Sequence, residues 1–210
     1  MGKMKKVILS AIAIIAFGFV NAQEVKFGIK TGMNLSNWTG DTKVRSLKYI
    51  FGINAGGFAE IKVSDRFGIQ PEILYSTQGT KNKNFGAYVD GRFRKGDIKM
   101  DLSYINIPVM FKYSTDGKSF MEAGPQIGFL TSAKARTKID GFSETVEEDV
   151  KKIFKSLDFG INIGAGYNFN KHLLTSLRYN IGLANIAKTE PGEDMKIHNS
   201  VFSLSMGYKF

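Results

Sequence analysis

The sequence has 210 residues, enough for one domain with a sizeable core, and it carries a formal net charge of +10. It contains no cysteine, which excludes disulfide-stapled scaffolds, thiolate metal sites and cysteine nucleophiles. Glycine (23 residues) and phenylalanine (17) are frequent and proline is scarce (4), a composition that favours long twisted strands and argues against disorder.

Residues 1–22 have the features of a cleavable signal peptide. Three lysines among the first six residues precede an apolar stretch over 7–20, which is followed by a small residue, Ala22, suited to cleavage. The apolar stretch is too short for a membrane helix, which needs about 20 residues. We therefore expect export, with Gln23 as the first residue of a single mature domain over 23–210.

After residue 23, apolar side chains recur at every second position, which is the period of a half-buried strand. In chain order the alternation predicts strands at about 26–35, 51–62, 67–76, 104–112, 122–129, 158–169, 173–183 and 201–210. The last strand is the clearest, since an unbroken apolar face is formed by Phe202, Leu204, Met206, Tyr208 and Phe210. Eight strands of this length suit a bacterial outer-membrane barrel, which has an even number of tilted strands.

The connections between these strands alternate strictly between short and long. The tight turns are Ser64-Asp65-Arg66, Thr115-Asp116-Gly117 and Asn170-Lys171-His172, and the long links cover about 37–48, 79–97, 132–156 and 187–197. Outer-membrane barrels have short periplasmic turns and long extracellular loops. We therefore expect an all-β, eight-stranded, antiparallel up-and-down transmembrane β-barrel.

The third long link allows two local structures. Thr145-Val146-Glu147-Glu148 has the form of a capping box with apolar residues at helical spacing after it, so that 145–156 would be a short amphipathic helix. Alternatively, Asp140-Gly141 turns a hairpin that extends the fifth and sixth strands beyond the membrane.

The polar strand faces are expected to line the lumen, because eight apolar faces would overfill an interior of this size. These polar faces carry the charged residues Lys30, Glu60, Glu72, Glu122, Asp158 and Arg178. Buried charges must be paired and hydrogen-bonded. We therefore expect a structural ion-pair network centred on Glu72, Glu122 and Arg178. Acid/base chemistry by the paired carboxylates is the alternative, but a filled lumen gives a substrate no access.

Several short motifs together resemble one known family. They are Phe27-Gly28-Ile29-Lys30-Thr31-Gly32-Met33-Asn34, Gln70-Pro71-Glu72-Ile73-Leu74-Tyr75-Ser76 with Gly79, Tyr104-Ile105-Asn106-Ile107-Pro108-Val109, and Gly124-Pro125-Gln126-Ile127-Gly128. On these segments the mature chain resembles the PorT-like outer-membrane β-barrel family of small bacterial barrels. The resemblance implies a Gram-negative outer-membrane location and, for some members, a link to secretion or gliding machinery. It supplies no catalytic residues.

The end of the chain carries a second resemblance. Tyr208-Lys209-Phe210 looks like the aromatic terminus by which the barrel-assembly machinery recognises its substrates. We therefore expect Tyr208 and Phe210 to act as an assembly signal.

Activity is expected in the outer loops, because a filled eight-stranded lumen is not a diffusion pore. The second long link is basic, and its cations could contact lipopolysaccharide phosphates or another acidic partner: Lys81, Lys83, Arg92, Arg94 and Lys95. The competing interpretation is an ordinary solvated loop. The expected partners are the outer membrane, lipopolysaccharide, the barrel-assembly machinery and an unidentified protein, whereas export argues against nucleic acid.

An enzyme and a ligand carrier are two other functional classes for a β-barrel of this size. A lipid-modifying hydrolase or surface protease would need a general base, usually histidine, and the sequence offers only His172 and His198. Motifs such as G-x-S-x-G, H-E-x-x-H and the P-loop are absent from the sequence. A periplasmic lipocalin-like carrier would instead turn the apolar faces inward around a ligand. We expect a non-enzymatic protein without a cofactor or metal.

Overall fold

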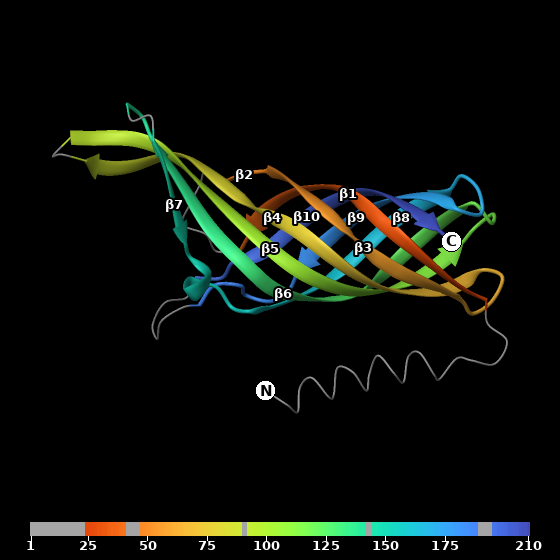
Figure 1. Cartoon of the computed structure of the whole chain (residues 1–210). Coiled ribbons are helices and arrows are strands. Elements are labelled where there is room, and N and C mark those ends of the chain that lie inside the picture. The colour runs from red at the N-terminus through yellow and green to blue at the C-terminus, as the bar shows by residue number, and fades with distance from the viewer. Residues whose placement is uncertain (1–23, 41–46, 90–91, 142–143, 189–194) are drawn as a thin grey trace.

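The computed structural model describes residues 24–40, 47–89, 92–141, 144–188 and 195–210, and most of them form one closed antiparallel β-barrel (Figure 1). The expected signal peptide over 1–22 lies outside the described residues. In the part of the chain that is described, no helix has the length and apolar character needed to cross a membrane.

Eight strands form the closed ring. They are β1 (Val25–Thr39), β3 (Ile50–Lys62), β4 (Phe67–Val89), β5 (Arg92–Ser114), β6 (Ser119–Ile139), β8 (Leu157–Asn168), β9 (Leu173–Gly182) and β10 (His198–Lys209). Each pairs with its neighbours in the chain, and antiparallel pairing of β1 with β10 closes the ring. Two short strands, β2 (Leu47–Lys48) and β7 (Thr145–Asp149), pair with β4 and β6, so that the sheet contains ten strands in all. The eight predicted strands are present, whereas β2 was not predicted.

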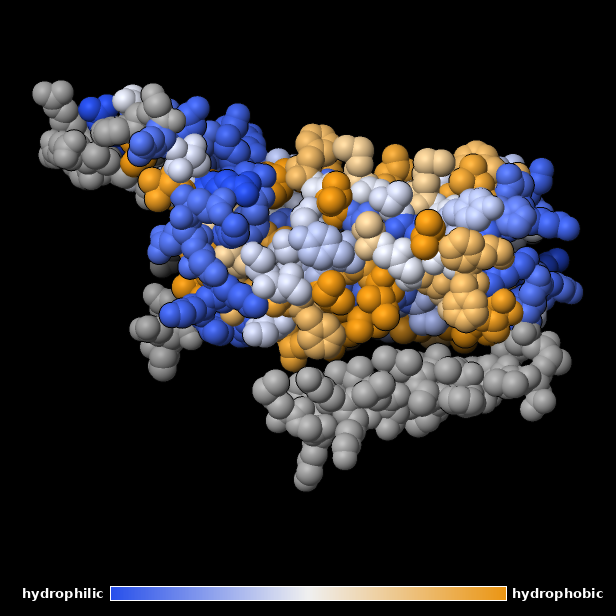
Figure 2. All heavy atoms as spheres, in the orientation of Figure 1, coloured by the Kyte–Doolittle hydropathy of each residue, from blue (hydrophilic) through white to orange (hydrophobic). Residues whose placement is uncertain are grey.

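The two faces of the ring strands differ as expected. Large apolar side chains point outward, as Phe51 (73% exposed) and Met33 (59%) do, while the neighbouring Asn34 is buried in the lumen (1%). On the face that Figure 2 shows, apolar residues form a belt across the middle of the barrel, with hydrophilic residues at both ends. The outward belt excludes the lipocalin-like arrangement, which needs the apolar faces inside.

One end of the barrel, here called the turn end, carries the three tight turns and a ring of aromatic side chains. Pairs of rings lie close together there: Phe67 and Tyr113 (centroids 5.0 Å apart), Tyr167 and Phe169 (5.4 Å), and Tyr208 and Phe210 (5.8 Å). Aromatic girdles of this kind mark the boundary between lipid and water, and short turns face the periplasm in barrels of this class.

At the opposite end, the outer end, three strands continue far past the apolar belt. β4, β5 and β6 have 23, 23 and 21 residues. We call their outer parts (77–89, 92–103 and 131–139) together with β7 the outer extension, which projects from one side of the barrel in Figure 1. At roughly 3.3 Å per residue, its β4 arm is about 40 Å long. Residues 79–89 and 92–97 of the loop expected over 79–97, and residues 132–139 of the loop expected over 132–156, are strands.

This correction has a physical cause. The base of the outer extension is buried at Leu102 and Ala133, but nearer its tip both faces meet water, so its strands do not need an apolar residue at every second position. Their stability comes from backbone ladders between β4, β5 and β6 and from cross-strand ion pairs. A search for apolar alternation cannot detect such strands.

The third link forms a hairpin of β6 and β7 and not a helix over 145–156, but β7 ends before β8 begins, so the hairpin extends the fifth predicted strand and not the sixth. Asp140 and Gly141 (φ +89°) form the turn, and β7 then runs back along β6. After β7, the helical structure among the described residues of this link is limited to the three-residue 3₁₀ helix η1 (Lys151–Ile153). Thr145 and Glu148, which would form the capping box, both lie in the exposed strand β7.

Candidate functional site

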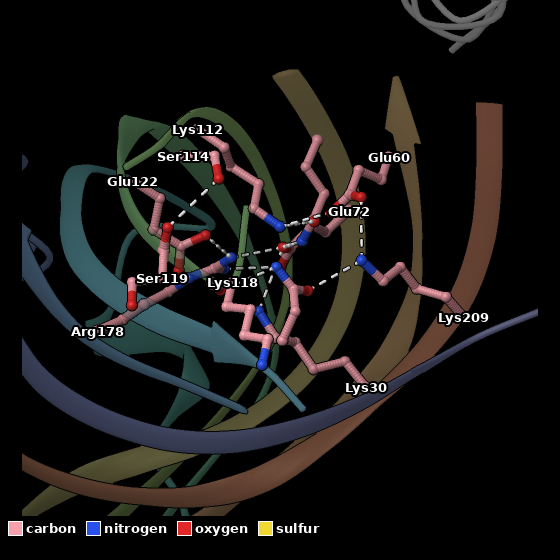
Figure 3. A network of polar contacts seen from close by, with 12 residues as sticks. Lys30, Glu60, Glu72, Lys112, Ser114, Lys118, Ser119, Glu122, Arg178 and Lys209 are labelled. Carbon is pink, nitrogen blue, oxygen red and sulfur yellow. Dashed lines mark hydrogen bonds and ion pairs between the residues drawn. The ribbon is translucent and has the colours of Figure 1, made fainter. Parts of the chain in front are cut away.

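The centre of the lumen is an arginine held between two carboxylates. Arg178 on β9 donates from Nη1 and Nη2 to Glu72 on β4 (2.7 and 2.6 Å), and from Nη2 and Nε to Glu122 on β6 (3.0 Å for Nη2). Figure 3 shows these side chains pointing toward one another inside the barrel. A guanidinium offers five donors in one plane, so it can form paired bonds to both carboxylates at once. The structure thus brings together the three residues expected at the centre.

Two further groups connect this centre to the turn end. Lys30 on β1 lies 3.3 Å from Glu72, and Gln70 donates a hydrogen bond to the same carboxylate. The other end of the Gln70 amide accepts a hydrogen bond from Lys112 on β5 (3.0 Å). Gln70 therefore joins the central ion pairs to a second charged group.

The second group is built around Glu60 on β3. Lys112 lies 2.6 Å from one Glu60 oxygen, and Lys209 on β10 lies 3.1 Å from the other. Lys209 also donates to the Asn168 side chain on β8 (3.0 Å). Every strand of the ring thus contributes to one connected set, here called the lumen network: Lys30, Glu60, Gln70, Glu72, Lys112, Glu122, Asn168, Arg178 and Lys209.

Sequence reasoning missed Lys112 and Lys209 as members of the lumen network. Both lie at lumen-facing positions of the alternation, because Lys112 follows Met110 by two residues and Lys209 stands between the outward Tyr208 and Phe210. The alternation of inward and outward positions along each strand was therefore enough to place both lysines in the lumen. With them the network has four cations and three carboxylates, so the surplus positive charge lies at the turn end, where both lysines share Glu60.

Asp158 does not join the lumen network, which corrects its inclusion among the expected network residues. It lies at the outer end of β8, where Asn199 donates to it (2.8 Å) and where it forms no ion pair with any cation in the described ranges. The same Asn199 amide also approaches the Tyr104 hydroxyl (3.4 Å). The alternation along the strand correctly predicts that Asp158 faces the lumen, but it does not give the position of the side chain along the barrel axis.

At the outer end of the lumen, buried residues form a hydrophobic cluster that we call the outer plug: Leu102, Tyr104, Leu130, Ala133, Phe154, Ile186, Ala187 and Ile197. Two connecting segments supply its lid. Phe154 pairs with Ala187 in an isolated bridge, and the amides of Lys155 and Lys188 donate to the carbonyls of Ile186 and Ile153 (2.8 and 2.9 Å). Between the outer plug and the lumen network lies a polar layer with a cavity of only about 30 Å³, the space of one or two water molecules.

The cations expected to contact an acidic partner lie on the outer extension, where several are already paired. Lys81 forms an ion pair with Asp97 (2.6 Å), and Arg94 donates to the Asp140 carbonyl (3.4 Å). Lys83 and Lys95 are exposed. The side chain of Arg92 lies outside the described residues. The expected cluster therefore presents two exposed lysines and not a uniformly basic surface.

Among the described residues, neither histidine ring has a hydrogen bond to a hydroxyl or carboxylate group, and each bonds to a backbone carbonyl through Nδ1. Nδ1 of His172 lies 2.8 Å from the Lys209 carbonyl, and Nδ1 of His198 lies 2.9 Å from the Ala184 carbonyl. Over the described ranges, no three His, Cys, Asp or Glu residues are grouped so that they could hold a metal ion.

Comparisons with known proteins agree with this architecture. The profile of a family described as "Outer membrane protein beta-barrel domain" matches residues 21–188. No curated protein gives a significant sequence match. Two solved barrels are similar in fold. Ail, the attachment invasion locus protein of Yersinia pestis, in complex with the heparin analogue sucrose octasulfate, has a TM-score of 0.51 at 14% identity over 89% of this chain and 99% of that chain. Neisserial surface protein A has a TM-score of 0.50 at 12% identity, with the same coverage of 89% and 99%.

Proposed function

This chain belongs to the outer membrane protein beta-barrel domain family, and from that premise we propose a non-enzymatic protein with a closed lumen that acts through its outer extension. Membership of the family gives an integral barrel in the outer membrane. Export by the segment 1–22, with cleavage after Ala22, is part of the proposal. No hydrogen bond among the described residues joins either histidine to a hydroxyl or carboxylate group, so no described feature favours a lipid-modifying hydrolase or protease.

The observation that carries the closed lumen is the lumen network, which links all eight ring strands across the interior. Arg178, Glu72 and Glu122 meet on the inside of strands from different sides of the ring, and the outer plug fills the space above them. An eight-stranded ring is only wide enough for side chains of this kind. A continuous water-filled path from one end to the other is therefore not expected.

Conductance tests this proposal directly. The full mature barrel, reconstituted into planar lipid bilayers, is expected to give no stable conductance steps under conditions where an open porin of larger strand number conducts. A heat-modifiable electrophoretic band on the same sample verifies that the barrel is folded. Steady, reproducible steps from the folded protein would contradict the closed lumen.

For the outer extension we propose contact with an anionic surface, such as lipopolysaccharide phosphates. Lys83 on β4 and Lys95 on β5 project from strands held beyond the apolar belt, where an acidic partner can reach them. The similar Ail barrel has been solved with the heparin analogue sucrose octasulfate, a polyanion. We extend that ligand chemistry to this chain.

Paired lysine variants distinguish a site from general charge. K83Q/K95Q is expected to weaken retention on immobilised lipopolysaccharide and to reduce the dependence of retention on salt. The control K152Q/K155Q removes the same charge from exposed positions near η1. Equal loss in both double variants would contradict a role specific to the outer extension.

The finer assignment within the family is also proposed here. The resemblance to the PorT-like group supports a membrane-structural or interaction role within a larger secretion or gliding assembly, with an unidentified protein as partner. Tyr208 and Phe210 are outward at the turn end (47% and 69% exposed), where the barrel-assembly machinery could engage them. Crosslinking from a cysteine introduced at Lys83 in intact cells tests the assembly, and capture of lipopolysaccharide alone would contradict a protein partner.

A further inference from the structure

The turn end of the barrel holds a second feature, a cavity of about 450 Å³ on the side of the lumen network that faces away from the outer plug. Its floor includes Lys112, Phe120 and Lys209, and its rim is formed by the three tight turns, with Arg66, Lys118 and Lys171. The volume falls within the range of small-molecule sites, roughly 300–1,000 Å³. Since short turns face the periplasm, the cavity opens to periplasmic solutes.

The lining of the cavity is strongly basic. It contains seven cationic residues (Lys26, Lys62, Arg66, Lys112, Lys118, Lys171 and Lys209) and three acidic residues (Glu24, Glu60 and Asp65). Two of the acids are neutralised on the rim, because Glu24 pairs with Lys26 (2.9 Å) and Asp65 with Lys62 (3.0 Å). Among the described lining residues, Glu60 is then the one remaining acidic residue, and five cationic residues remain.

The two floor lysines share that carboxylate and are almost completely buried. Lys112 is 7% exposed and Lys209 is 5% exposed, and each approaches a different oxygen of Glu60. An ammonium group has three donors. Lys112 directs two of them to Glu60 and Gln70, and Lys209 directs two to Glu60 and Asn168.

The floor is therefore short of negative charge. Two buried ammonium groups with one carboxylate leave one positive charge without an ionic partner among the described residues, which is unfavourable for groups with so little exposure to water. The face of the Phe120 ring lies 3.9 Å from Lys112 Nζ and compensates part of this charge. A second anion between Lys112 and Lys209 would supply the remainder.

We propose that this cavity binds a small soluble phosphate compound from the periplasm, with Lys112 and Lys209 contacting the anion at the floor. The rim cations attract the anion, and the floor lysines hold it by charge-assisted hydrogen bonds, for which phosphate oxygens are good acceptors. Glu60 competes with the ligand for the same two ammonium groups. The proposal is independent of the outer extension and leaves the closed lumen unaffected if it fails.

Calorimetric titration of the folded barrel with inorganic pyrophosphate, in zwitterionic detergent at low salt, tests the site. The wild-type chain is expected to bind one pyrophosphate saturably. E60Q keeps one oxygen acceptor for the lysines but removes the competing charge, so its dissociation constant is expected to be about tenfold lower. K112M/K209M is expected to lose measurable binding, whereas the rim control K118Q/K171Q is expected to keep the single site with an affinity reduced only a few fold.

Two results would overturn the proposal. One is the absence of saturable binding in both the wild type and E60Q when heat-modifiability shows that both are folded. The other is loss of binding in K118Q/K171Q with no change in E60Q, which would mean that the rim attracts anions and the floor contributes nothing.

A lipid headgroup offers the same phosphate chemistry, so the titration is repeated in vesicles. Equal pyrophosphate affinity in phosphatidylcholine vesicles and in vesicles containing phosphatidylglycerol supports a soluble ligand. Loss of the titratable site only in phosphatidylglycerol vesicles would assign it to a lipid headgroup and contradict the soluble ligand.

Discussion

Arg178 and Glu72 face each other across the lumen, 106 residues apart in the chain, and are joined by two hydrogen bonds of 2.7 and 2.6 Å. They come from β9 and β4, which are not neighbours in the ring. Their side chains therefore fix the distance between two walls that no backbone ladder connects. Because Glu72 is 2% exposed, this bond cannot be replaced by water without opening the barrel.

Glu72→Gln is therefore expected to destabilise the barrel strongly. The substitution leaves Arg178 with one carboxylate and leaves Lys30 without its ion pair. Breaking a buried pair by removing one partner typically costs about 3–5 kcal/mol. Urea unfolding of the lipid-embedded barrel, followed by the heat-modifiable band, measures the loss.

The exposed pair Lys62–Asp65 provides the control for this prediction. Its side chains are 49% and 98% exposed, so Asp65→Asn is expected to change stability by less than about 1 kcal/mol. Similar losses in Glu72→Gln and Asp65→Asn would contradict a special structural role for the lumen network.

Phe154→Ala is expected to loosen the lid of the outer plug. The ring is 3% exposed and packs against Trp38 with the centroids 5.7 Å apart, and its removal leaves a cavity between the two lid segments. A large core truncation of this kind typically costs about 3–5 kcal/mol when the site cannot collapse. Hydrogen exchange should accelerate at the amides of Lys155 and Lys188, which hold the segments together. Unchanged protection of both amides, with the rest of the barrel intact, would show that the plug does not depend on Phe154.

The ring strands could be predicted from sequence because lipid requires an apolar side chain at every outward position. Residues such as Phe51 and Leu204 are exposed for this reason, and the pattern they form gives strand position and face. The outer parts of β4 and β5 lack this constraint and were predicted as a loop. For the lumen, the alternation along each strand identifies the charged residues that point inward, such as Glu60. The alternation does not show which of these charged side chains contact one another, because strand tilt and stagger set the position of each side chain along the barrel axis.

Gly79 is expected to tolerate no larger residue. Its φ is +148°, and a Cβ built there would lie 1.9 Å from the Met100 carbonyl oxygen on β5. Gly79 also binds Ser36 on β1 through both its amide and its carbonyl (2.9 and 3.1 Å), at the base of the outer extension. Gly79→Ala therefore combines backbone strain, of order 1–3 kcal/mol, with a steric clash. Thermal unfolding in detergent measures the expected loss.

Gly57→Ala is the matched control for this position. A Cβ on Gly57 would meet only the Gly28 carbonyl, at 3.6 Å, which is an ordinary contact. The alanine should be neutral or slightly stabilising, because it restricts the unfolded chain. A loss of stability at Gly57 as large as that at Gly79 would mean that neither φ nor the close approach explains the requirement for glycine.

The pairing of β7 with β6 is expected to weaken in acid. Hydrogen bonds from Lys134 and Arg136 hold the pKa of the exposed Glu147 carboxyl below its ordinary value. Because this pKa is lowered, the ion pairs of Glu147 stabilise the β6–β7 pairing fully above the ordinary pKa of glutamate, near 4.3. This stabilisation is lost as the pH falls through the lowered pKa. Amide exchange along β7 should therefore accelerate below about pH 4 relative to the exchange of β8. Glu147→Gln should abolish this pH dependence, whereas Glu148→Gln, on the opposite face of β7, should preserve it. If β7 protection falls with pH equally in both variants, the anchor lies elsewhere than in the Glu147 ion pairs.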